Sequence, residues 1–171
     1  TTPSVVITSN TAGTISSSLE FSSTTTGIVG ANTITFNTLS DNTYIGETVT
    51  FTDSIGNATT ITLTTFTIDT VAPNLNETTP ITTPTSDNTP SVVITSNEAG
   101  TITSSLAFSS TTSGIVGANT ITFNTLSDNT YNGETVTFTD SIGNATTITL
   151  TTFVINSSTS QTYSIDVVGY N

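Results

Sequence analysis

Apolar and polar residues alternate over short stretches of this chain, and Gly, Asn, Asp or Pro separates the stretches. Alternation over four to eight residues is typical of half-buried strands, whereas a helix needs apolar residues every three to four positions over several turns, which no stretch offers. Seven strands are predicted in the second half of the chain, at residues 75–81, 91–96, 101–108, 110–115, 119–123, 131–139 and 145–155. The pattern therefore predicts an all-β fold.

The phase of the alternation predicts which side chains face the core. In the sixth stretch Val136 and Phe138 share one face and threonines the other. In the seventh stretch the apolar phase changes between Leu150 and Phe153, which predicts a β-bulge near Thr151. The predicted core contains Val93, Ile102, Phe123, Val136, Phe138, Ile148 and Leu150.

The chain is an internal repeat. Residues 3–68 align with residues 90–155 at a constant offset of 87, and six of these 66 positions differ. The differing pairs are Thr11/Glu98, Ser16/Thr103, Glu20/Ala107, Thr26/Ser113, Ile45/Asn132 and Thr67/Val154. We therefore expect repeat 1 at residues 1–69, repeat 2 with a linker and its own first strand at residues 70–156, and a tail at residues 157–171. Repeat 1 is expected to lack the first strand that residues 74–81 supply to repeat 2.

Charge excludes several functions. The chain has 12 acidic residues and no Lys, Arg or His, so its formal net charge is −12. Binding to nucleic acid or to an anionic membrane surface requires Lys or Arg, and both are excluded as electrostatic partners. Membrane insertion is not expected, because no apolar run approaches the roughly 20 residues of a membrane span. Cysteine is absent, so disulfides cannot stabilise the repeats.

Catalysis is not expected either. General acid–base chemistry would depend on carboxylates alone, without a cationic side chain to stabilise a developing anion. Acidic residues such as Glu47 and Asp53 lie in motifs that recur in both repeats rather than in a distinctive pocket sequence. We predict that the protein is not an enzyme and requires no cofactor.

Several motifs together resemble those of a known family. Residues 126–144 begin Leu-Ser-Asp-Asn-Thr-Tyr and end Asp-Ser-Ile-Gly-Asn, and residues 39–57 repeat this order. The linker Ile-Asp-Thr-Val-Ala-Pro at residues 68–73 and the turn Asn-Glu-Ala-Gly at residues 97–100 accompany it. In this order they resemble the bacterial immunoglobulin-like (Big-type) repeats of large surface adhesins and extracellular fibres.

The resemblance implies two tandem immunoglobulin-like β-sandwiches of about seven strands each, at the cell surface or outside the cell. It also implies that Tyr44 and Tyr131 form tyrosine corners, in which the phenol hydrogen-bonds to upstream backbone. Some members of the family carry a Cys pair that this chain lacks, which raises the importance of cations or of assembly.

Calcium is the most credible ligand, because hard cations bind clustered carboxylate and carbonyl oxygens. If the strand order is immunoglobulin-like, four acids would converge at the joint of the repeats: Asp41, Asp69, Glu98 and Asp140. The alternative is that they are solvated turn residues that bond nearby backbone. Four Asn-x-Ser/Thr sequons could carry sugar, although a Thr-rich chain contains such sites by chance: Asn57, Asn76, Asn144 and Asn156.

The tail suggests how molecules could join. Tyr163, Ile165 and Val167 alternate with other residues, which predicts an extra C-terminal strand. Donated to repeat 1 of the next molecule, that strand would complete a sandwich and generate an open head-to-tail homopolymer. The function expected is a structural subunit of an extracellular filament. The alternative is a spacer or stalk fragment of a giant adhesin, stiffened by calcium, and no adhesion target is indicated.

Overall fold

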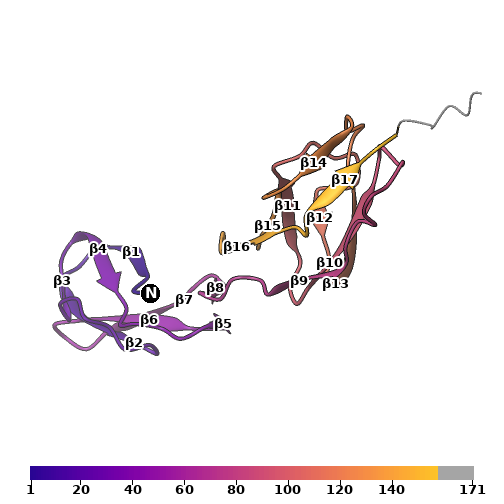
Figure 1. The fold of residues 1–171 in the computed structure, drawn as a ribbon. Helices are drawn as coiled ribbons and strands as arrows, with labels where there is room; N and C mark the ends of the chain where they lie inside the picture. Colours follow the sequence, from indigo (N-terminus) through magenta and orange to yellow (C-terminus); the bar gives the residue numbers. More distant parts are fainter. Residues whose placement is uncertain (158–171) are drawn as a thin grey trace, which may run out of the picture. The chain divides into compact units, whose positions relative to one another are not determined.

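The computed structural model describes residues 1–157, and all regular structure in this part of the chain is β (Figure 1). The prediction of an all-β fold is confirmed for these residues. The chain divides into two compact units, Thr1–Thr70 (unit 1) and Val71–Asn171 (unit 2). Within the described range there is no helix that could cross a membrane.

Unit 2 contains two sheets and a separate strand pair among its described residues. The first sheet has the order β13-β10-β9, the second the order β12-β11-β15-β16, and the pair is β14-β17. Their bounds are β9 Leu75–Thr79, β10 Ser91–Ser96, β11 Gly100–Ser104, β12 Ser113–Gly114, β13 Gly117–Thr122, β14 Asn129–Tyr131, β15 Thr135–Thr139, β16 Ala145–Thr149 and β17 Phe153–Ile155. All pairings between these strands are antiparallel.

Unit 1 repeats this arrangement with one strand fewer in its described residues. Its sheets have the orders β1-β4 and β3-β2-β6-β7, and β5 pairs with β8. The strands are β1 Ser4–Ser9, β2 Gly13–Ser17, β3 Thr26–Gly27, β4 Gly30–Thr35, β5 Asn42–Tyr44, β6 Thr48–Asp53, β7 Ala58–Thr62 and β8 Phe66–Ile68. The register of β1 on β4, with Ser4 opposite Thr35, recurs in β10 and β13, with Ser91 opposite Thr122. The 87-residue offset therefore persists in the pairing.

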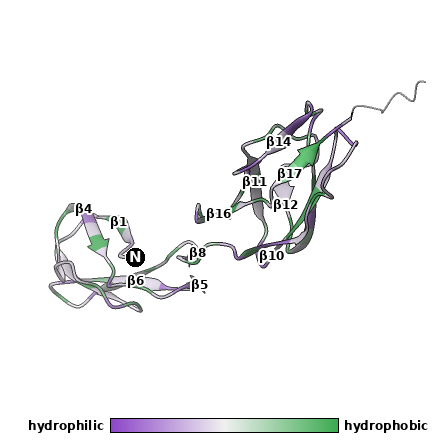
Figure 2. Ribbon diagram, in the orientation of Figure 1, coloured by the Kyte–Doolittle hydropathy of each residue, from purple (hydrophilic) through white to green (hydrophobic). Residues whose placement is uncertain are grey.

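The core of unit 2 lies between its two sheets. Val92, Ile94 and Ile121 of the first sheet belong to the same buried cluster as Ile102 and Phe138 of the second. Two sheets that share one apolar core are compatible with a β-sandwich. The strand β17 also contributes two residues to this cluster, and it stands out as apolar in Figure 2.

The prediction that Val93 belongs to the core is wrong. Val93 is only half-buried, whereas its neighbours Val92 and Ile94 are fully buried. Three consecutive apolar residues carry no alternation, so the sequence could not determine which phase faces the core. Ile148 is half-buried and packs against the cluster.

The two longest predicted strands each divide into two strands of different sheets. The stretch 131–139 breaks after Tyr131, and Gly133 provides a positive φ of 79° before β15 begins. The stretch 145–155 breaks between Thr149 and Phe153, so the predicted bulge there is wrong: β16 pairs with β15, and β17 pairs with β14. The irregularity that does occur lies in the β9–β10 pair, between Val93 and Ile94.

Glycine in the shortest strands allows close packing. A Cβ atom on Gly114 of β12 would collide with the ring of Phe138, and one on Gly27 of β3 would collide with the ring of Phe51. Each ring therefore lies against bare backbone, which only glycine permits.

Candidate functional site

The clearest difference between the two nearly identical units lies along one sheet edge. In unit 2, β10 pairs with β13 on one side and with β9 on the other. Its counterpart β1 in unit 1 pairs with β4 on one side, and its other edge has no strand partner among residues 1–157. An unpaired edge leaves backbone N–H and C=O groups without ladder bonds and is a template for strand addition.

In unit 2 a longer stretch, residues 74–85, covers this edge, and we call it the edge segment. Asn74 N–H donates to the Asn97 side-chain oxygen at 2.6 Å, which ties down the start of the segment. At the other end, Thr85 N–H donates to the Val154 carbonyl at 3.0 Å, and Asn156 N–H donates to the Thr85 carbonyl at 2.8 Å. The edge segment thus crosses from β10 to β17.

The side chains of the edge segment seal the core of unit 2. Ile81 is 6% exposed and belongs to the buried cluster, and Leu75 packs against the same cluster. The Glu77 carboxylate accepts hydrogen bonds from both the N–H and the hydroxyl of Thr151, at 2.9 and 2.7 Å. Apolar and polar contacts therefore both hold the segment in place.

Identical side chains are more exposed in unit 1, where this segment has no counterpart among the described residues. Phe138 of unit 2 is 0% exposed, but the corresponding Phe51 is only half-buried. Phe153 is 1% exposed, while its counterpart Phe66 is also half-buried. The same loss of burial occurs at Val5, Leu63 and Ile68, whose counterparts are Val92, Leu150 and Ile155.

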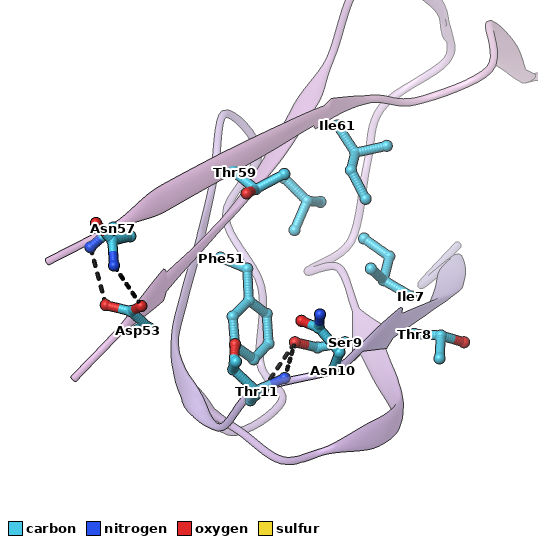
Figure 3. Close-up of a pocket in the computed structure, with 11 residues that line it drawn as sticks. Ile7, Thr8, Ser9, Asn10, Thr11, Phe51, Asp53, Asn57, Thr59 and Ile61 are labelled. Carbon is cyan, nitrogen blue, oxygen red and sulfur yellow. Dashed lines mark hydrogen bonds between the residues drawn. The ribbon is translucent and has the colours of Figure 1, made fainter. Parts of the chain in front are cut away.

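Two hollows lie along β1 where the edge segment lies along β10, and we call them together the β1 groove. The first has a volume of about 460 Å³ and is bordered by β1, β6 and β7 (Figure 3). Ile7, Phe51 and Ile61 supply apolar parts of its lining, which also includes the exposed Asn10. The second, of about 390 Å³, lies between β1 and β8 and includes Thr64 in its lining.

The groove matches the covered edge of unit 2 almost residue for residue. Every residue that lines either hollow is identical to its counterpart 87 positions later, except Thr11 and Thr67, which correspond to Glu98 and Val154. The chemistry that holds residues 74–85 in unit 2 is therefore present in unit 1. Sequence reasoning did not identify these lining residues, because the contact of Glu77 with Thr151 joins residues 74 positions apart.

The predicted tyrosine residues both bond upstream backbone. Tyr44 donates from its hydroxyl to the Ser40 carbonyl at 3.0 Å, and Tyr131 donates to the Ser127 carbonyl at 3.1 Å. Each ring also stacks on an aromatic ring of the paired strand, Phe66 in unit 1 and Phe153 in unit 2. These contacts fasten the β5–β8 and β14–β17 pairs.

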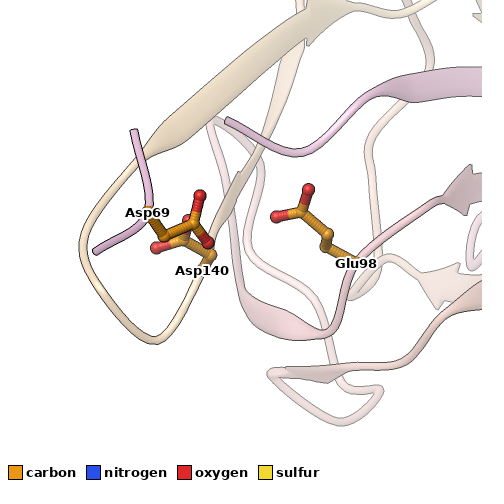
Figure 4. A group of neighbouring side chains, drawn as sticks. All are labelled: Asp69, Glu98 and Asp140. Carbon is orange, nitrogen blue, oxygen red and sulfur yellow. The ribbon is translucent and has the colours of Figure 1, made fainter. Parts of the chain in front are cut away.

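The acidic residues considered as calcium ligands have different surroundings. Asp41, in unit 1, accepts the hydroxyl of Thr70 at 3.0 Å on both carboxylate oxygens. Figure 4 draws the other three, of which Asp69 belongs to unit 1 and Glu98 and Asp140 belong to unit 2. Within unit 2, carboxylate oxygens of Glu98 and Asp140 lie within 4.8 Å of each other.

Asp140 is extensively hydrogen-bonded within its own hairpin. One oxygen accepts the backbone N–H groups of Ile142, Gly143 and Asn144, and the other accepts the Asn144 side-chain amide at 2.8 Å. Desolvation raises the pKa of Asp140, but these bonds outweigh it and hold the pKa below its ordinary value. Turn bonding of this kind is what the solvated-turn alternative predicts for Asp140.

Asp53, the counterpart of Asp140 in unit 1, also has a lowered pKa. The side-chain amide of Asn57, followed by its backbone N–H, lowers the pKa of Asp53 against a smaller opposing effect of desolvation. Asn57 and Asn144 are both sequons, and the nitrogen that would carry sugar donates to Asp53 or Asp140. Asn76 and Asn156, the other two sequons, are exposed.

The donor-strand residues Tyr163, Ile165 and Val167 lie outside the described residues. Comparison with known proteins found no matching family model, no matching curated protein and no matching solved structure.

Proposed function

We propose that the protein is a structural subunit of an extracellular filament, built from two immunoglobulin-like sandwiches in tandem. Molecules join head to tail when the C-terminal strand of one chain enters the β1 groove of the next. The observation that carries this proposal is that identical core side chains are covered by residues 74–85 in unit 2 and left open along β1 in unit 1.

The energetics of an open edge support strand donation. An added strand would give β1 a second ladder of backbone hydrogen bonds and would cover side chains such as Phe51 and Phe66. Each apolar side chain moved from the surface into a core contributes about 1.5–3 kcal/mol. In the proposed complex Tyr163, Ile165 and Val167 face the groove, and their alternation gives the added strand one apolar face.

Head-to-tail contacts of this kind use two different surfaces of the molecule, so they continue without closing unless a rotation brings the ends together. A filament rather than a closed dimer is the expected product. The partner is a second copy of this chain, and no small-molecule cofactor takes part.

Removal of the tail tests the proposal. A chain that ends at Ser157 keeps the hydrogen bonds that Ser157 donates to Asp128 and loses the donor strand. We expect the full chain to form filaments in electron microscopy and to sediment as a polymer, and the shortened chain to stay monomeric. A full-length control with Ile165→Asp and Val167→Asp should also stay monomeric, since aspartate would replace both aliphatic side chains on the apolar face of the strand. Filaments from the shortened chain would show that another segment fills the groove.

A second candidate is a spacer within the stalk of a larger surface protein. The equal strand registers of the two units, at a constant offset of 87 residues, favour a modular array. In that case the β1 groove would receive the first strand of its own repeat from a longer chain, and Ca²⁺ would bind acidic residues that include Glu98 and Asp140. Tail removal would then leave the assembly state unchanged.

A further inference from the structure

The edge segment of unit 2 shows which side chains fit such a groove. Its most specific contact is polar: the Glu77 carboxylate accepts the N–H and the hydroxyl of Thr151. The counterpart of Thr151 in unit 1 is Thr64, which is exposed and lines the β1 groove. Among residues 1–157, neither the N–H nor the hydroxyl of Thr64 has a hydrogen-bond partner. The groove therefore contains a ready donor pair for a carboxylate.

The groove also has an apolar subsite, at the position of a side chain four residues after the carboxylate. Ile81 lies four residues after Glu77 and shares its buried cluster with Phe153 and Ile155. The counterparts of these two residues, Phe66 and Ile68, line the β1 groove and are half-buried. A large aliphatic side chain four residues after the carboxylate would restore the burial that Phe66 and Ile68 lack.

The ends of the groove offer backbone-binding groups in matching positions. The side-chain oxygen of Asn97 accepts the N–H of Asn74, and its counterpart Asn10 lines the first hollow. The N–H of Val154 donates to the hydroxyl of Thr83, and the counterpart N–H belongs to Thr67 in β8. Only backbone is needed from residue 67, so its change from Val to Thr leaves this contact available.

Because the chain has no Lys, Arg or His side chain, neutral hydroxyl and N–H groups are the donors available to a carboxylate. A carboxylate ligand cannot be held by Lys, Arg or His, so hydroxyl and N–H groups must supply the bonds. Unit 1 also carries Thr11 where unit 2 carries Glu98, so the lining of the first hollow has one negative charge fewer than its counterpart. Asp53 remains in the lining of that hollow, so the substitution lowers the repulsion that an acidic strand meets there without removing it.

We infer that the β1 groove is a selective receptor for an extended acidic peptide, with a carboxylate bound by Thr64 and a large aliphatic side chain four residues later. The preferred occupant has the sequence pattern of residues 74–85. The tail of the proposed filament is a weaker ligand by this criterion, because Asp166, its one acidic residue, is followed four residues later by Tyr170. The inference rests on the proposed function in that the groove receives a strand, but it concerns the side chains that the groove selects. Apart from Thr11 and Thr67, the groove and the surface that binds residues 74–85 in unit 2 have the same lining.

A labelled synthetic peptide of residues 74–85, titrated with the full chain and followed by fluorescence anisotropy, tests this inference. We expect saturable binding that weakens at least roughly tenfold in a peptide with Glu77→Gln, because hydrogen bonds to a charged group are worth more than those to a neutral one. A peptide with Ile81→Ser should bind still more weakly. Binding should strengthen with added NaCl, since peptide and protein are both acidic.

Matched variants of the protein locate the site. Thr64→Val removes the hydroxyl from the β1 groove and should weaken binding several-fold. Thr151→Val makes the same change in unit 2, where residues 74–85 are already in place, and should leave peptide binding unchanged. The peptide with Glu77→Gln should lose less affinity in the Thr64→Val variant than the unchanged peptide does, because the hydroxyl bonds a neutral amide oxygen more weakly than a carboxylate.

The outcomes separate this inference from the proposed filament. No binding of the peptide, or equal binding of the unchanged peptide and the one with Glu77→Gln, overturns the carboxylate selectivity even if tail removal abolishes filaments. Selective peptide binding together with filaments that persist without the tail supports the receptor and refutes tail donation. If both proposals hold, an excess of peptide should slow filament growth by competing for the groove.

Discussion

At the residue scale, hydroxyl and amide groups replace the salt bridges that this chain cannot form between side chains. Ser18 donates to Glu47 at 2.6 Å, and Ser105 donates to Glu134 at the same distance in unit 2. Thr151 binds Glu77 in the same manner. Bonds to an ionised acceptor are about twice as strong as neutral ones, so a Thr- and Ser-rich chain can satisfy its carboxylates without cations.

The hairpin aspartates give a prediction about pH. Asp53 and Asp140 have pKa values held below the ordinary value of 3.8. A carboxyl whose pKa is lower in the folded state stabilises the fold above its unfolded pKa, and that contribution is lost as pH falls through the folded value. Carboxyl titration by NMR should show both groups ionising below the ordinary Asp range.

Variants of the partner amides check the cause. Asn57→Ala should raise the pKa of Asp53 and leave Asp140 unchanged, because the Asn57 side chain makes the largest contribution there. Asn144→Ala should act on Asp140 in the same way. A titration midpoint of Asp53 that does not move in Asn57→Ala would show that the amide is not responsible.

At the element scale, one additional edge strand changes the burial of a whole sheet. β6 and β15 have nearly the same sequence, yet Phe138 is fully buried and Phe51 is not. Neither strand differs locally, since both pair with equivalent neighbours in their own sheet. The two units differ in the opposite sheet, where β9 pairs with β10 in unit 2 and the edge segment adds Ile81 to the buried cluster of Phe138.

This contrast predicts unequal costs for the same substitution. Truncation of a fully buried Phe to Ala costs about 3–5 kcal/mol, and a half-buried Phe loses less apolar contact. We expect Phe138→Ala to destabilise unit 2 by at least about 1 kcal/mol more than Phe51→Ala destabilises unit 1. Hydrogen exchange of β15 and β6, followed by mass spectrometry, measures each unit separately. Equal costs under conditions that keep the chain monomeric would mean that the β1 groove is not open in solution.

The strands also show which features of the fold the sequence pattern could predict. Strand positions and the constant offset followed from alternation and repetition, and β10 has the predicted bounds of 91–96. The division of the long stretches into β14 and β15, and into β16 and β17, was missed. The chain passes from one sheet to another where its pairing partner changes, as from β15 to β14 for the stretch 145–155. The sequence near Thr151 and Gly133 does not indicate which strand is the partner.

At the scale of the whole molecule, the uncompensated charge is the dominant electrostatic feature. With a formal net charge of −12, carboxylates repel one another across the surface. Salt screens such repulsion, with a Debye length of about 10 Å at 0.1 M ionic strength. The folded state concentrates this charge more than the unfolded chain does.

Stability should therefore rise with salt. We expect NaCl to raise the melting temperature, and CaCl₂ at matched ionic strength, after prior chelation, to have a similar effect, since Asp140 is already bonded within its hairpin. The thermal melt should be accompanied by calorimetric titration with Ca²⁺. Heat of binding and a larger shift with CaCl₂ would favour the calcium-stiffened stalk, and Glu98→Gln should then remove the excess shift.

The sequence by itself determined the all-β fold, the repeat and its offset, because alternation, turn residues and self-similarity are local properties of the chain. It also predicted that residues 1–69 contain no counterpart of the first strand of repeat 2. Only the tertiary structure decided that a groove lies along β1, with a donor pair at Thr64 and a half-buried wall of Phe51 and Phe66. The reason is physical: burial and hydrogen-bond partners depend on segments that meet across the core, and those contacts join residues far apart in the chain.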